Sequence, residues 1–156
     1  MKKFTLFVVA LLVAMLAVVP AFAQTDYEAV DPTGVTVDFW YQHSGTRAVQ
    51  INAMIAVFND PDVVVEDFLA TQEAELDEDE VAFITEIIEN LRDVAREYNP
   101  YGIVVNGSFQ GGYGDIFEKM LLGVEAGELP NLVVAYQNQA ATYELDGVLL
   151  YLTPLV

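Results

Sequence analysis

Residues 107–140 decide the fold and read GSFQGGYGDIFEKMLLGVEAGELPNLVVAYQNQA. The stretch opens with a glycine-rich turn over 107–114, and apolar residues then recur at the i, i+3, i+4, i+7 spacing of one buried helix face. These residues are Ile116, Phe117, Met120, Leu121 and Val124. Gly127 and Pro130 end the predicted helix, and the continuous apolar run 132–136 is typical of a strand buried on both faces. Turn, helix and strand together predict a crossover unit of a parallel sheet.

Outward from this unit the chain repeats the alternation of strand and helix. Residues 35–41 alternate apolar and polar side chains as a strand does, and Ser44 is placed to cap a following helix. The stripe expected on that helix comprises Ala48, Ile51, Met54, Ile55 and Phe58. A second strand begins at 103–105, a short helix over 140–146 ends at Gly147, and 148–152 is expected to be a fourth strand. The fold class predicted is α/β, a mostly parallel sheet with helices on both faces.

The intervening segment, 60–97, is dominated by carboxylates and holds 14 of the chain's acidic residues. Asp77 and Glu80 match a capping box, and an apolar helical stripe follows them. Its members are Val81, Ile84, Ile88, Leu91 and Ala95. Residues 73–80 lack the glycine and alternating ligands of a calcium loop, so a solvated acidic face is favoured. Residues 62–72 fit strand and helix equally, and the charge predicts that 60–96 lies at the periphery of the fold.

The first 23 residues have the features of a secretory signal peptide. Lys2 and Lys3 precede an apolar run, and Ala21 and Ala23 supply the small residues of a cleavage site. An uncleaved membrane anchor is the competing interpretation, but no basic stop-transfer flank follows. We therefore expect cleavage after Ala23, a leader over 24–33, and a soluble periplasmic or extracellular protein.

Composition excludes several functions. With 24 acidic residues against six basic ones, the chain would be repelled by nucleic acid and by anionic membranes. His43 is the only histidine and there is no cysteine, so neither a zinc site nor a nucleophile–histidine pair is expected. The sequence thus predicts no enzyme activity, no catalytic residues, no metal and no cofactor.

A binding site is better supported, because aromatic and neutral polar residues follow the predicted strands. These residues are Trp40, Tyr41 and His43 after the first strand, Tyr113 in the glycine-rich turn, and Tyr136, Gln137, Asn138 and Gln139 after the third. The carboxyl ends of parallel strands meet at one edge, where open α/β sheets bind ligands. Core packing is an equally good interpretation of Trp40 and Tyr136, because strand alternation can turn either inward.

Several motifs resemble the bacterial extracellular solute-binding proteins, family 1, which deliver carbohydrates to ABC importers. VTVDFWYQHSG at 35–45, FEKMLLGVEAGELP at 117–130 and QNQAATYELDGVLLYLTPLV at 137–156 occur in the family's order. The resemblance covers 35–59 and 97–156, with 60–96 as an insertion. It implies a type II periplasmic-binding-protein-like fold, in which 34–156 would form an incomplete N-terminal lobe. The chain would then be an N-terminal fragment of such a protein.

The resemblance also implies site residues and a function. Tyr41 and His43 fall in the family's first ligand loop, Tyr113 matches its Gly-x-Tyr turn, and Gln137 stands where glycerol-3-phosphate-binding relatives have an acidic contact. The expected function is capture of a neutral carbohydrate or polyol in the periplasm for an ABC permease in the membrane. The alternative is a secreted α/β interaction domain that uses the acidic helix 78–98 as its docking surface.

Overall fold

The computed structural model describes residues 29–152, so the predicted signal peptide and its cleavage site lie outside the described residues. The chain divides into two units, and every element named below belongs to the one that begins at Pro32. Among the described residues, no helix combines the length and the apolar character needed to cross a membrane.

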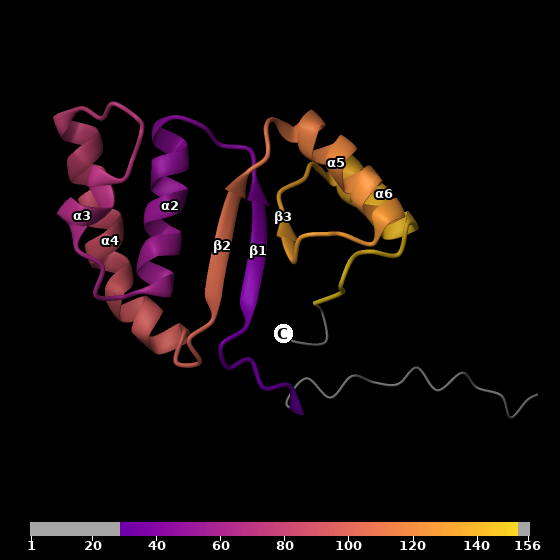
Figure 1. Cartoon of the computed structure of the whole chain (residues 1–156), viewed down its shortest axis with the longest axis horizontal. Coiled ribbons are helices and arrows are strands. Elements are labelled where there is room, and N and C mark those ends of the chain that lie inside the picture. Colours follow the sequence, from indigo (N-terminus) through magenta and orange to yellow (C-terminus); the bar gives the residue numbers. More distant parts are fainter. Residues whose placement is uncertain (1–28, 153–156) are drawn as a thin grey trace, which may run out of the picture. The chain divides into compact units, whose positions relative to one another are not determined.

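Three parallel strands form an open sheet in the order β2-β1-β3 (Figure 1). Strand β1 is Thr36–Tyr41, β2 is Val104–Phe109 and β3 is Leu132–Val133. All six residues of β1 pair with β2, whereas β3 pairs only with Phe39 and Trp40. The α/β class and parallel sheet predicted from the sequence are confirmed. The fourth strand over 148–152 is not present, because within the described chain these residues have no ladder partner and 149–152 are exposed.

Helix α2, Thr46–Asn59, packs on the face of the sheet that carries Tyr41 and Gly107. The bare α carbon of Gly107 admits the Ile55 side chain, because an added Cβ would overlap it. The expected cap and stripe are wrong. The N-cap is Gly45, Met54 is exposed, and the fully buried positions are Val49, Ala53 and Val57. Apolar side chains occur on more than one face of α2, because this helix packs against the sheet on one side and against α4 on the other.

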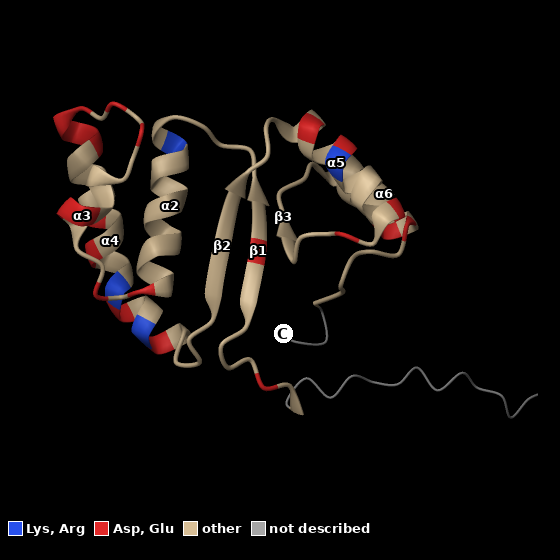
Figure 2. Ribbon diagram, viewed as in Figure 1, with Lys and Arg blue, Asp and Glu red and all other residues tan. Residues whose placement is uncertain are grey.

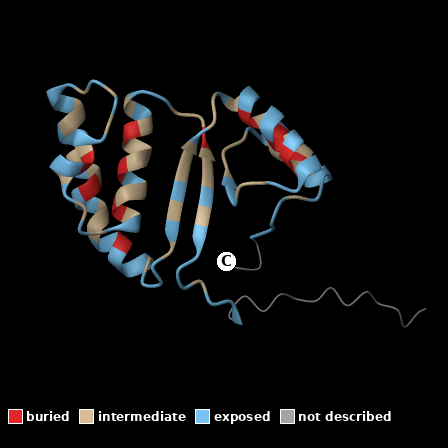
Figure 3. Cartoon of the chain, in the orientation of Figure 1, coloured by how far each residue is buried: buried red, intermediate tan, exposed pale blue. Residues whose placement is uncertain are grey.

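Helices α3, Val65–Ala70, and α4, Glu78–Tyr98, pack against α2 on the side away from the sheet (Figure 1). One hydrophobic cluster joins the three helices, with Phe68, Ile84 and Ile88 buried against the α2 residues (Figure 3). The capping box and most of the apolar stripe of α4 are confirmed. The predicted peripheral position of 60–96 is wrong, because this segment supplies half of a core cluster while its carboxylates point outward.

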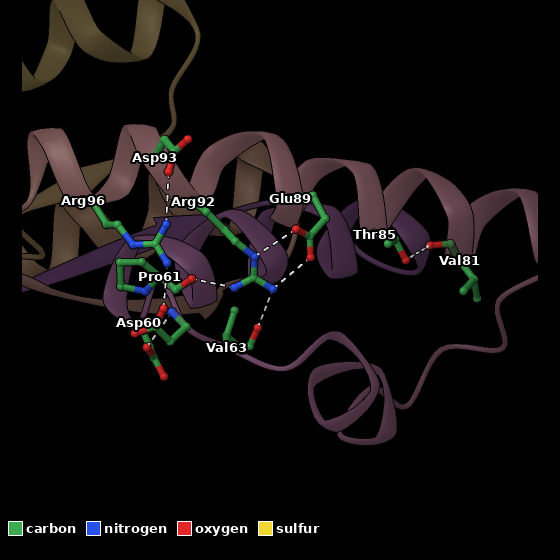
Figure 4. A network of polar contacts seen from close by, with 10 residues as sticks. Asp60, Pro61, Val63, Val81, Thr85, Glu89, Arg92, Asp93 and Arg96 are labelled. Atoms are coloured by element: carbon green, nitrogen blue, oxygen red, sulfur yellow. Dashed lines mark hydrogen bonds and ion pairs between the residues drawn. The ribbon is translucent and has the colours of Figure 1, made fainter.

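A short polar network fixes the chain between α2 and α3 (Figure 4). Arg92 of α4 donates to the backbone carbonyls of Pro61 and Val63 and pairs with Glu89 at 3.0 Å. Arg96 donates to Asp62 at 2.7 Å. These bonds occupy two of the few cations, and they fix the turn at 61–62 and the residues that lead from it into α3.

Helices α5, Tyr113–Ala126, and α6, Gln137–Leu145, form a second cluster on the opposite face of the sheet. Ile116, Met120 and Tyr143 are buried there against Trp40 and Val133. Gly127 ends α5 with φ 73°, as predicted. Helices therefore lie on both faces of the sheet.

Several boundaries differ from expectation. The short helix predicted over 140–146 is α6, and it begins three residues earlier, at Gln137. Residues 107–109 belong to β2 rather than to the glycine-rich turn, because Gly107 to Phe109 pair with Phe39 to Tyr41. The predicted strand over 132–136 shrinks to two residues, and Leu132 is 52% exposed rather than buried on both faces. The chain leaves the ladder early because Tyr136 is already the N-cap of α6.

Candidate functional site

The carboxyl ends of the three strands meet at one edge of the sheet, where Gln42 and His43 follow β1. Residues 110–112 follow β2, and residues 134–136 link β3 to α6. Helices α2, α5 and α6 each begin at this edge (Figure 1). Such an edge is where open parallel sheets present groups to a ligand, because loops rather than ladders occupy it.

Two tyrosines stack at this edge, Tyr113 as the first residue of α5 and Tyr136 as the N-cap of α6. The ring centroids of Tyr113 and Tyr136 lie 4.1 Å apart, with ring planes inclined by 30°. Local backbone bonds position both rings. Gly111 adopts a φ of 95°, a left-handed backbone conformation that glycine reaches more easily than other residues. The Gly112 N–H then donates to Asp115 Oδ2 at 2.7 Å, and α5 begins at Tyr113. Tyr136 is 53% exposed, so one side of the pair faces solvent.

Gln42 connects β1 to this tyrosine pair. Its Nε2 donates to the Tyr113 hydroxyl at 3.0 Å and lies 3.2 Å from His43 Nε2. Its Oε1 is buried and has no hydrogen-bond partner in the described part of the chain. The sequence-based prediction missed Gln42. Strand alternation could have found it, since Gln42 is two residues beyond Trp40 and therefore points to the same face.

Two predicted site residues belong to the core. Trp40 packs against the cluster formed with α5 and α6. Tyr41 is 4% exposed and points to the other face, where its hydroxyl donates to Asn52 Oδ1 at 3.0 Å. Burial raises the pKa of the Tyr41 hydroxyl, and the Asn52 hydrogen bond lowers it by less. Strand alternation separates the two neighbours, so they do not form one aromatic platform.

The three polar residues 137–139 do not line up at a strand end, because they form the first turn of α6. Gln137 and Asn138 are exposed at the edge. Gln139 is buried, and both ends of its amide are used. Its Oε1 accepts from the Tyr136 N–H and its Nε2 donates to the Tyr113 carbonyl oxygen, both at 2.9 Å. Gln139 therefore joins the backbones of the two stacked tyrosines at the starts of α5 and α6.

A hollow of about 510 Å³ lies on the other side of the β1 terminus, between the start of α2 and the segment after α3. Its walls are a mixture of small, polar and aromatic residues: His43, Ser44, Gly45, Ala48, Val49, Asn52, Thr71, Gln72, Glu73, Ala74 and Phe109. The volume is in the range of small-molecule sites. His43 lines the hollow and lies 3.2 Å from Gln42 Nε2, which in turn donates to the Tyr113 hydroxyl.

No family model, curated protein or solved structure matches this chain. The site must therefore be interpreted from its own chemistry. No group of three or more histidine, cysteine, aspartate or glutamate side chains is gathered for a metal ion among residues 29–152.

Charged side chains are unevenly distributed over the fold, and few available cations lie near the edge. Carboxylates concentrate on α3, α4 and the segment that joins them (Figure 2). Lys119 of α5 is occupied, because its Nζ donates to the backbone oxygen and the side-chain oxygen of Gln110 at 2.9 and 2.8 Å. Arg47 lies in the first turn of α2 with an exposed side chain. An anionic ligand would therefore meet few available cations at this edge.

Proposed function

We propose that this protein captures a neutral carbohydrate or polyol at the carboxyl edge of its sheet, as the substrate-binding component of an ABC importer. The observation that carries the proposal is the stacked pair of Tyr113 and Tyr136. Sugar rings present apolar C–H faces, and aromatic rings that are held rigidly and left partly exposed are suited to cover such faces. The hydrogen bonds of Gln42 and Gln139 supply the rigidity.

The neighbouring polar groups are consistent with a hydroxyl-rich ligand. Gln137 and Asn138 are exposed in the first turn of α6, and the Tyr113 hydroxyl already accepts from Gln42, which leaves its own proton to donate. The acidic surroundings disfavour phosphate esters and sugar acids. Delivery to a membrane permease from the periplasm, and a type II periplasmic-binding-protein-like lobe, rest on the sequence resemblance and form part of the proposal.

The test is a calorimetric titration of the whole chain with neutral monosaccharides, disaccharides and polyols. We expect at least one saturable ligand, and we expect Tyr113→Ala and Tyr136→Ala each to weaken it by roughly tenfold, since stacking contributes about 1–1.5 kcal/mol. Tyr98→Ala is the matched control, because Tyr98 is an exposed tyrosine on α4 outside the site. Absence of any saturable ligand would contradict the proposal, and so would equal losses in all three variants.

A second candidate is an interaction domain that docks a basic partner on α4. The outward face of this helix favours it, because Glu78, Asp79 and Glu97 are exposed while Ile84 and Ile88 face the core. The same tyrosine variants separate the two candidates. Sugar binding that depends on Tyr113 favours capture, whereas a partner would contact α4 and tolerate the loss of Tyr113.

A further inference from the structure

An apolar groove of about 220 Å³ lies between the C-terminal halves of α2 and α4. Val57 and Ala95 line it with buried side chains, whereas Met54, Val94 and Tyr98 line it with exposed ones. No charged side chain takes part in the lining. Large apolar side chains that stay exposed next to one another commonly mark a surface that another molecule covers.

Hydrogen bonds between the two helices fix both ends of this arrangement. Thr46 Oγ1 at the start of α2 donates to Glu80 Oε1 in the first turn of α4 at 2.8 Å. Where the helices end, Asn99 is the C-cap of α4, and its Nδ2 donates to the carbonyl oxygen of Phe58 at 3.0 Å. The two helices therefore run in the same direction, side by side (Figure 1). Such a preformed groove lowers the ordering cost of binding.

Negative charge borders the groove along α4 (Figure 2). Glu97 follows Val94 by three residues, so the two side chains are neighbours on the helix surface. Glu86 lies on the same side as Glu97, because eleven residues are about three helical turns. Both carboxylates are exposed, and Glu97 has no ion pair or hydrogen bond among residues 29–152. Both helices also end beside the groove, and helix C-termini carry a partial negative charge.

Positive charge does not offset this border. Arg92 and Arg96 line the space between α3 and α4 instead, and carboxylates pair with both of them there. Arg47 is exposed about two turns before Met54 on α2 and does not line the groove. A second copy of this chain would be repelled, because each copy carries a formal net charge of −18. The apolar lining and the acidic border together fit a partner that is apolar and basic.

We infer that this groove docks a basic amphipathic helix of a partner protein. Its apolar side chains would lie between Met54 and Val94, and its lysine or arginine side chains beside Glu86 and Glu97. A helix suits the groove better than a strand, because both walls are helices whose backbone groups are already bonded internally. This inference specifies the surface and the partner chemistry of the interaction-domain candidate, and it does not depend on carbohydrate capture.

The experiment measures, by fluorescence anisotropy, the binding of the full chain to three labelled peptides of about four helical turns. The first has leucine and lysine at helical spacing, the second has the same composition in strict alternation, and the third has glutamate in place of lysine. We expect the first peptide to bind at least roughly fivefold more tightly than the other two. Covering a half-exposed apolar side chain corresponds to roughly three- to tenfold in affinity, so Met54→Gln and Val94→Gln should each weaken it by about that factor. Leu122→Gln is the matched control, because Leu122 is an exposed apolar residue of α5 outside the groove.

A second pair of variants tests the acidic border. Glu97→Gln should weaken the first peptide, whereas Glu125→Gln, which removes the same charge from the exposed surface of α5, should change its affinity less. Equal losses within either pair, Glu97 with Glu125 or Val94 with Leu122, would mean that only the overall negative charge attracts the peptide, and would overturn the inference. Equal affinities of the helical and alternating peptides would overturn it too, as would absence of binding by the helical peptide. Dimerisation of the chain that Val94→Gln abolishes would assign the groove to a second copy instead. None of these results bears on the sugar titration.

Discussion

Tyr41 and Tyr143 are both buried, at 4% and 1% exposure, but their hydroxyl groups have different surroundings. The Tyr41 hydroxyl donates to Asn52, whereas the Tyr143 hydroxyl has no partner in the described part of the chain. Burial raises the pKa of both groups. A buried polar group without a partner costs about 1–3 kcal/mol, while a satisfied hydrogen bond contributes about 1 kcal/mol.

This difference predicts opposite effects of the same substitution. Tyr143→Phe should leave the free energy of unfolding unchanged or raise it by up to ~1 kcal/mol, since no hydrogen bond is lost. Tyr41→Phe should lower it by about 1 kcal/mol, because Asn52 loses its donor. Urea unfolding of the two variants measures both. A loss in Tyr143→Phe as large as that in Tyr41→Phe would show that its hydroxyl is satisfied.

For single residues, the sequence predicted which of them lie at the carboxyl edge of the sheet better than it predicted which face of the sheet their side chains occupy. Tyr113 was placed in the site by its glycine neighbours, and the structure keeps it at the edge. Trp40 fits the site and the core equally in the sequence, and Tyr41 is predicted as a site residue, but strand alternation sends the two into opposite packed faces. Alternation gives the face on which Gln42 lies, but no local pattern reveals that Gln42 and Gln139 both bond to Tyr113, which is 71 and 26 residues away in sequence.

Among the elements, α5 contains two glycines with different surroundings. A Cβ on Gly123 would lie 2.6 Å from the carbonyl oxygen of Glu128, whereas a Cβ on Gly114 would have nothing within 4 Å. Gly123 is buried, and its carbonyl accepts the Glu128 N–H at 3.0 Å. The chain after α5 therefore turns back closely over Gly123, and only a glycine allows that approach.

Alanine substitution should accordingly have opposite effects on the free energy of unfolding at the two glycines of α5. Alanine is favoured over glycine in helices by up to ~1 kcal/mol, so Gly114→Ala should stabilise or be neutral. Gly123→Ala should destabilise by roughly 1–2 kcal/mol, because the clash with a backbone oxygen exceeds the gain in helix propensity. Thermal unfolding monitored by circular dichroism gives both values. Stabilisation in both variants would show that the turn over Gly123 relaxes easily.

Elements with a clear period were predicted, and those that depend on pairing partners were not. The α5 helix and the α4 capping box follow local rules and are present. The run 148–152 has strand-like residues, yet it has no neighbouring strand among the described residues and forms none. Strand β3 is short for a different reason, since Gln139 bonds the Tyr136 N–H and starts α6 early.

For the molecule as a whole, alternation of strands and helices was sufficient to predict a parallel α/β sheet. The position of 60–96 was not predicted, because its carboxylates dominate the composition while its apolar side chains recur only every three or four residues. Those side chains, with Ile84 and Ile88 at the centre, bury the outer face of α2. Charge and core therefore occupy opposite faces of one helix rather than separate parts of the chain.

The excess of carboxylates has a consequence for stability. The chain carries a formal net charge of −18, and self-repulsion of this kind destabilises a compact state. The exposed ion pairs of Arg96 with Asp62 and Asp93 offset little of it, because such pairs contribute at most about 1 kcal/mol. Salt shortens the screening length from about 30 Å at 0.01 M to about 8 Å at 0.15 M, which weakens repulsion among distant carboxylates more than attraction within contact pairs.

We therefore expect the melting temperature to rise by several degrees between 0.01 and 0.15 M sodium chloride, since about 1 kcal/mol corresponds to roughly 3–6 °C for a domain of this size. A variant with Glu75, Glu97 and Glu125 changed to glutamine is the control. These three carboxylates are exposed and lie on separate elements, so their neutralisation should raise the melting temperature at low salt and reduce its salt dependence. A melting temperature that falls with salt in both proteins would mean that the ion pairs around Arg92 and Arg96 outweigh the repulsion among the other carboxylates.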